Sequence, residues 1–145
     1  MPGMQNKNQR IAISLSGKWD LAFDPANTGK ERKWFRRFPE SVPMQVPGVW
    51  ERIKPGYDGV GWYRKTFTVE KNWKSGTIRV RFGAVHYFSE AWLNGEFLGG
   101  HEGGASPFEF DITAASVAGR NELIVLVINP PMDREIEGLR SGAPL

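Results

Sequence analysis

Apolar residues alternate with polar ones in several short stretches of the chain, with the period of two that is typical of half-buried β-strands. Stretch 77–82 shows this pattern most clearly, and 18–23 and 61–69 show it as well. Stretch 123–128 differs, because its six residues are all apolar. That pattern favours a central strand covered on both faces.

A β-hairpin is predicted around Asn94-Gly95, which separates the apolar stretches 86–93 and 96–99. Asn-Gly favours a type I′ turn, because both central residues of that turn need a positive φ. The glycine-rich run 99–104 comes next, and its glycines indicate tight turns. A further strand is expected at 108–112.

No segment of useful length has the period of an α-helix. Segment 27–38 is basic, holds three aromatic residues, and is interpreted as an irregular crossing. Prolines 39, 43 and 47 keep the next stretch extended. Short strands without alternating helices predict an all-β sandwich or barrel and argue against a parallel α/β sheet.

Composition narrows the possible classes of protein. The 145 residues suit one domain, and 40% hydrophobic with 24% charged residues is ordinary for a globular protein. No cysteine is present, which excludes disulfides and cysteine-based metal or nucleophile sites. Residues 1–10 form a polar lead-in without an apolar signal core, and no stretch approaches ~20 apolar residues. We therefore expect a cytoplasmic protein with no membrane partner.

The basic residues of segment 27–38 superficially resemble a nucleic-acid patch. Glu31 and Glu40 dilute the positive charge of this segment, and the net charge of +3 is too small to require an anionic partner. A solvated crossing with buried aromatics is the favoured interpretation, and no nucleic-acid partner is expected.

The titratable residues give no catalytic or metal motif of their own. Glu102 and Glu109 are interpreted as a turn residue and an outward-facing strand residue, and no catalytic pair is assigned. His86 and His101 lie fifteen positions apart without a third ligand, so no metal site is expected. We expect His101 to anchor its loop by a side-chain hydrogen bond. The glycine run lacks the helix and Gly-Lys-Ser/Thr of a phosphate site, and no cofactor is expected.

A longer motif surrounds the hairpin. Its residues are Trp92, Asn94, Gly95, His101, Gly103, Gly104, Pro107, Phe108, Asp111, Ile112 and Thr113. Further matching segments are 15–25, Val-Pro-Gly-Val-Trp at 46–50, Gly-Trp-Tyr-Arg-Lys-Thr-Phe at 61–67 and Asn-Glu-Leu-Ile-Val-Leu-Val at 121–127. In this order, the segments resemble the N-terminal sugar-binding domain of family 2 glycoside hydrolases, the group of β-galactosidases, β-glucuronidases and β-mannosidases.

The resemblance implies a jelly-roll β-sandwich of the galactose-binding-domain type over residues 11–129. A further strand would close this sandwich in the family, but residues 130–145 are polar and have no strand pattern. The family's second β-sandwich and its catalytic barrel are also not found in the sequence. The chain is therefore expected to be a fragment, with 130–145 a truncated tail leading toward a missing closing strand.

The resemblance also implies a function for the intact enzyme, which would hydrolyse terminal β-linked sugars with retention. The family's two catalytic glutamates lie in its barrel, so this chain alone is expected not to catalyse the reaction. The expected partners are a carbohydrate and the missing domains of the same polypeptide. In some family members a residue near position 86 reaches the catalytic pocket, which makes His86 and Tyr87 the candidate substrate-binding residues.

Two alternatives remain open. The first is a free-standing carbohydrate-binding module, which should expose a flat row of aromatic side chains. The second is a non-catalytic packing domain, which should bury its aromatics or present an apolar patch. Solvent exposure distinguishes the binding module from the packing domain, and the side chains to examine are Trp50, Trp62, Trp73 and Trp92.

Overall fold

The computed structural model describes residues 11–83, 85, 87–103 and 106–129. The predicted lead-in 1–10 and tail 130–145 lie outside these residues. In chain order the elements are β1 (Gly17–Phe23), β2 (Val42–Val46), η1 (Trp50–Arg52), β3 (Gly59–Val69), η2 (Lys71–Ser75), β4 (Arg79–Phe82), β5 (Phe88–Leu93), β6 (Glu96–Glu102), β7 (Phe108–Asp111) and β8 (Gly119–Asn129). The two η elements are short 3-10 turns, and no described residue lies in an α-helix. The predicted all-β class is confirmed.

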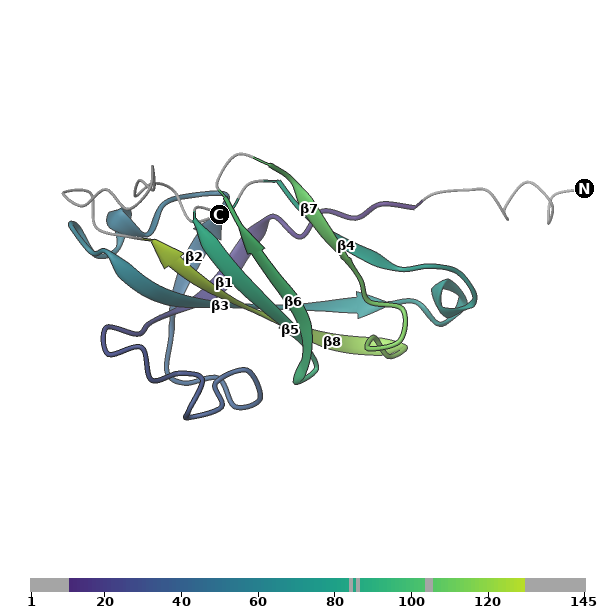
Figure 1. The fold of residues 1–145 in the computed structure, drawn as a ribbon. Helices are drawn as coiled ribbons and strands as arrows, with labels where there is room; N and C mark the ends of the chain where they lie inside the picture. Colours follow the sequence, from purple (N-terminus) through teal and green to yellow (C-terminus); the bar gives the residue numbers. More distant parts are fainter. Residues whose placement is uncertain (1–10, 84, 86, 104–105, 130–145) are drawn as a thin grey trace, which may run out of the picture.

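The strands form two antiparallel sheets (Figure 1). The larger sheet has six strands in the order β2-β1-β3-β8-β5-β6, and the smaller one pairs β4 with β7. The chain moves from the large sheet to the small one after β3 and again after β6. The small sheet packs over one face of the large sheet, and the side chains of the two sheets share a core.

Strand β8 is the centre of the large sheet. It pairs with β3 from Gly59↔Asn129 to Val69↔Gly119, and with β5 on its other side. Its residues from Leu123 to Val127 are all fully buried. The unbroken apolar run therefore forms the central strand that the sequence predicts.

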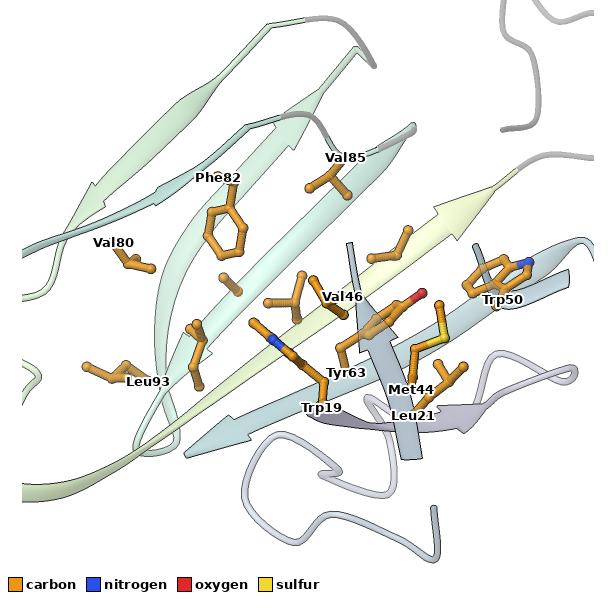
Figure 2. Close-up of a cluster of buried hydrophobic side chains, with 14 of the residues drawn as sticks. Trp19, Leu21, Met44, Val46, Trp50, Tyr63, Val80, Phe82, Val85 and Leu93 are labelled. Atoms are coloured by element: carbon orange, nitrogen blue, oxygen red, sulfur yellow. The ribbon is translucent and has the colours of Figure 1, made fainter. Parts of the chain in front are cut away.

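A hydrophobic core fills the space between the two sheets (Figure 2). The large sheet contributes Trp19, Leu21 and Tyr63, among others, and the small sheet contributes Val80 and Phe82. The last two are the residues that the alternation in 77–82 directs inward, while Arg79 and Arg81 are exposed.

The hairpin at Asn94-Gly95 forms as predicted. Leu93 pairs with Glu96, and φ is 52° at Asn94 and 84° at Gly95, both in the left-handed region that a type I′ turn needs. The register shifts between Ala91 and Trp92, which is a β-bulge. The carboxamide of Asn94 donates to the Ala115 carbonyl and to Asn121 Oδ1, so the hairpin tip is tied to the turn before β8 and to the first residues of β8.

Segment 27–38 folds over the outer face of the large sheet, the face away from the small sheet. Trp34, Phe35 and Phe38 pack there on a second apolar cluster, which contains Trp62 and Trp92. The interpretation as an irregular crossing is therefore confirmed, although its three aromatic residues are only partly buried. No described helix is long and apolar enough to span a membrane.

Candidate functional site

A groove of about 1430 Å³ opens between the two sheets. Segment 11–16 lines one side of it, and the edge of β4 with residues 75–78 lines another. Its lining also includes Trp19 and Val46 of the large sheet, and Figure 2 shows Val80 and Phe82 of the small sheet on the other side of the core from them. The groove is thus a continuation of the core that reaches the surface.

Strand β4 borders this groove with an unpaired edge, since among the described strands it pairs with β7 alone. Ile11 and Ile13 lie in the lining with 65% and 52% of their surfaces exposed. Free backbone groups beside exposed apolar side chains are the features that accept an additional strand. Sequence reasoning expected an open edge in this fold but did not place it at β4.

Of the two candidate substrate-binding residues, Tyr87 is described and His86 lies outside the described residues. Tyr87 is half-buried and lies immediately before β5. Its backbone N–H donates to the Ile128 carbonyl at 3.0 Å, and its carbonyl accepts from the N–H of Gly103 at 3.0 Å. These bonds place Tyr87 at the end of the large sheet, beside the glycine-rich loop after β6. Its substrate-binding role stays a prediction.

His101 is held differently from the expectation. Its Nδ1 is buried and has no hydrogen-bond partner in the described part of the chain. The imidazole instead stacks on Phe108, with ring centroids 4.0 Å apart and planes at 8°. The predicted side-chain hydrogen bond of His101 is not found among the described residues, where its contact is an aromatic one between β6 and β7.

The tryptophans do not form an exposed row. Trp50, Trp62 and Trp92 are buried, and Trp73 is half-buried in the lining of the groove. Trp62 stacks on Trp92 beneath segment 27–38, while Trp50 stacks on Tyr63 in the inner core. The flat aromatic platform expected of a free-standing binding module is thus not seen for these four side chains.

The carboxyl groups with described partners have structural roles. Asp24 is buried and accepts from the backbone N–H groups of Thr28 and Gly29 and from Nε1 of Trp62, each at 2.9 Å. Asp20 accepts two hydrogen bonds from Arg64, which also forms an ion pair with Glu122.

At the end of β7, hydrogen bonds from Thr113 lower the pKa of the Asp111 carboxyl. Glu109 is exposed on β7, as predicted, whereas Glu102, interpreted as a turn residue, is the exposed last residue of β6. No metal-binding group of three His, Asp or Glu residues occurs among the described positions.

Tyr63 and Glu51 form a feature that the sequence did not reveal. The Tyr63 hydroxyl and Glu51 Oε1 are both buried without a hydrogen-bond partner in the described part of the protein. Burial, assisted by the negative charge of Glu51, raises the pKa of Tyr63 well above its usual range. The alternation in 61–69 places Tyr63 on one face of its strand, but no sequence pattern signals an unpaired hydroxyl.

Comparisons with known proteins agree with this architecture. The family model described as "Glycosyl hydrolases family 2, sugar binding domain" matches residues 12–137. A β-glucuronidase of Paenibacillus borealis is 35% identical over 121 residues, which cover 79% of this chain and 20% of that protein. A β-galactosidase of Thermoanaerobacter pseudethanolicus is 41% identical over 71 residues, which cover 49% of this chain and 10% of that protein.

Solved structures give the same match in three dimensions. A β-glucuronidase from Ruminococcus gnavus, solved in complex with uronic isofagomine, superposes with a TM-score of 0.78 at 31% identity, covering 81% of this chain and 21% of that one. The chain thus spans about a fifth of the length of the β-glucuronidases that it matches. From its fold and its match over residues 12–137, the chain belongs to the sugar-binding domain family of the family 2 glycosyl hydrolases.

Proposed function

We propose that the chain is the N-terminal accessory domain of a β-glucuronidase-type enzyme that hydrolyses terminal β-linked sugars with retention. One observation carries this proposal: β-glucuronidases at 31–35% identity match about four fifths of the chain, and the match takes up a fifth of their length. The β-galactosidase match supports the broader β-glycosidase class, but it covers only 49% of the chain.

In this proposal the two catalytic carboxylates belong to a barrel domain elsewhere in the same polypeptide, with a second β-sandwich between the two domains. Retaining glycosidases need two carboxyl groups about 5–5.5 Å apart, one of which acts as an acid. The described carboxyl groups support the assignment of catalysis to the barrel and not to this domain. Asp24 and Asp20 are occupied by structural donors, and Glu102 and Glu109 are exposed on separate strands.

The end of the large sheet that carries Tyr87 is the part we assign to the substrate pocket, together with His86. Its support is the position of Tyr87 between the end of β8 and the loop at Gly103. A side chain at the rim of a sheet can reach a neighbouring domain, whereas one in the centre of the core cannot.

We also propose that the fold is a jelly-roll sandwich whose small sheet takes one more strand, supplied by a longer polypeptide. The supporting features are the edge of β4 that no described strand pairs and the partly apolar groove beside it. A strand there would hydrogen-bond to β4 and cover Ile11 and Ile13. The groove also keeps the packing-domain alternative open, since it offers apolar surface to a neighbour.

Two assays test the function. The purified chain, incubated with chromogenic β-glucuronides and β-galactosides, should show no turnover. Turnover that is lost in Glu102→Gln or Glu109→Gln would contradict a purely accessory role.

The second assay places this chain in the Ruminococcus gnavus β-glucuronidase in exchange for the matching segment. The chimera should hydrolyse an aryl β-glucuronide, and Tyr87→Ala should reduce kcat/KM in it. A chimera that has the parent's assembly and melting behaviour but no activity would refute the proposed function.

A further inference from the structure

Segment 28–37 is a compact loop rather than a loose crossing. Its backbone closes two successive turns, with the N–H of Arg32 donating to the Thr28 carbonyl at 3.1 Å and the N–H of Arg37 donating to the Lys33 carbonyl at 3.0 Å. The buried Asp24 carboxylate fixes its start through the N–H groups of Thr28 and Gly29. The loop is therefore held in one conformation.

Aromatic side chains anchor this loop to the sheet. Trp34 meets Trp62 edge-on, with ring centroids 5.8 Å apart, and Phe35 stacks on Trp92 at 5.2 Å. Gly29 is packed so closely that a Cβ there would lie 2.6 Å from the Trp62 indole. With the aromatic residues turned inward, the basic residues point to solvent.

The outward side of the loop carries positive charge that the described residues leave mostly unpaired. Residues 30–37 contain five basic side chains and one acidic one, Glu31. Lys30 forms an ion pair with Glu90 of β5. The other four are exposed and make no ion pair or side-chain hydrogen bond in the part of the chain that the structure describes; they are Arg32, Lys33, Arg36 and Arg37.

An exposed aromatic ring lies beside this charge. Phe97 of β6 is 54% exposed and contacts Trp92 with ring centroids 5.4 Å apart, while Phe35 stacks on the same indole. A Cβ on Gly95 would lie 3.2 Å from Cγ of Arg36, so Arg36 lies against the hairpin turn that leads to Phe97. Arg36 and the exposed ring of Phe97 therefore both lie near the tip of the β5–β6 hairpin.

We propose that Arg36 and Phe97 form a binding surface for an acidic polysaccharide, specifically a chain that contains uronic acid units. A guanidinium pairs with a carboxylate through two parallel hydrogen bonds, and the apolar C–H face of a pyranose ring covers an aromatic side chain. Arg32, Lys33 and Arg37 provide attraction for successive carboxylates. This inference rests on the proposed function in one step only, the choice of a sugar acid as the anion that the surface binds.

This surface is separate from the end of the sheet assigned to the substrate pocket. Tyr87 precedes the start of β5, whereas the hairpin with Phe97 follows its last residue, Leu93. A six-residue strand spans roughly 20 Å. The surface would therefore hold a polymer at a distance from the bond being cut.

The test is isothermal titration calorimetry of the 145-residue chain with a hyaluronan octasaccharide, at about 20 mM salt, where charges act over ~20 Å. We expect binding with a Kd below about 1 mM that weakens steeply as salt is raised. Arg36→Gln should weaken it about tenfold, and Phe97→Leu, which keeps an apolar side chain but removes the flat ring, about fivefold. Arg52→Gln, an exposed arginine of η1, is the matched control and should bind as the parent does.

Two comparison ligands test the alternatives. Cellohexaose, a neutral sugar, tests for general sugar binding, and an oligothymidylate, a non-sugar polyanion, tests for general binding of negative charge. No binding of the uronate chain, equal binding of either comparison ligand, or equal loss in Arg52→Gln overturns the proposal. Melting temperatures show that the variants are folded. Hydrolysis of a small aryl glucuronide by the unsubstituted chimera is measured separately, so failure of that activity bears on the proposed function and not on this surface.

Discussion

The two faces of the six-stranded sheet are covered in different ways. The outer face is covered by an irregular loop, which a buried carboxylate and stacked aromatic rings hold in place. The inner face is covered by a regular two-stranded sheet, which leaves a partly apolar groove and an edge of β4 that no described strand pairs. Regular secondary structure is thus the less complete cover here. A face of the sheet is completely covered only when the polar backbone groups and apolar side chains on it have partners. The loop on the outer face comes closer to this than the small sheet on the inner face.

The largest expected effect concerns the open inner face. A polypeptide extended past Leu145 far enough to supply the closing strand should melt roughly 10–20 °C higher and associate less. Each Å² of apolar surface removed from water contributes ~25 cal/mol, so a few hundred Å² contributes several kcal/mol, and 1 kcal/mol shifts the melting temperature of a domain of this size by about 3–4 °C. Calorimetry and sedimentation of both lengths provide the measurement. If the 145-residue chain is monomeric, melts sharply and gains nothing from extension, the inner face is already closed.

The stability of the loop that covers the outer face should depend on Asp24. Asp24→Ala removes the acceptor of three N–H groups and should lower the free energy of unfolding by about 2–4 kcal/mol. Asp20→Ala is the matched control, because that carboxylate pairs with Arg64 in a partly exposed position and should cost about 1 kcal/mol or less. Urea unfolding of both variants makes the comparison. Equal costs would show that the loop is held by its aromatic residues alone.

Close packing under the loop leads to a smaller effect. Gly29→Ala forces a methyl group against the Trp62 indole and should cost about 1–3 kcal/mol, with a change in tryptophan fluorescence. Gly83→Ala meets open space and should leave stability within about 0.5 kcal/mol of the parent. The idea of a tightly closed outer face fails if the two substitutions behave alike.

The smallest effect is expected in the inner core, at Tyr63. Its hydroxyl is buried without a described partner, so Tyr63→Phe should leave the free energy of unfolding unchanged or raise it by up to about 1 kcal/mol. Tyr57→Phe should instead cost about 1 kcal/mol, since the Tyr57 hydroxyl donates to the Val60 carbonyl at 2.7 Å. Chemical denaturation of the two variants shows whether each substitution raises or lowers the free energy of unfolding. A clear loss of stability in Tyr63→Phe would mean that this hydroxyl has a partner.

Local patterns were sufficient to predict much of the fold. Alternation and unbroken apolar runs report burial directly, so β4 and β8 could be placed from the sequence, and Asn94-Gly95 specified its own turn. The sequence indicated the irregular crossing 27–38, but not how it is held to the sheet, because Asp24 accepts from Thr28 and Gly29 nearby and from Trp62 far along the chain. The pairing of β4 depends on distant strands in the same way. For the candidate site, the sequence named Tyr87 from resemblance, but the groove and the surface at Phe97 arise only when separate strands meet.

The central position of β8 has a consequence for the order of events during synthesis. Strands β1 to β3 and the β5–β6 hairpin leave the ribosome first, yet each group joins the large sheet only through β8. Until residue 129 has emerged, the large sheet consists of two separate antiparallel pieces whose inner edges are open. Long-range pairing of this kind is intrinsically slow. We therefore expect the sheet to assemble in one late step once β8 is available, rather than strand by strand as the chain grows.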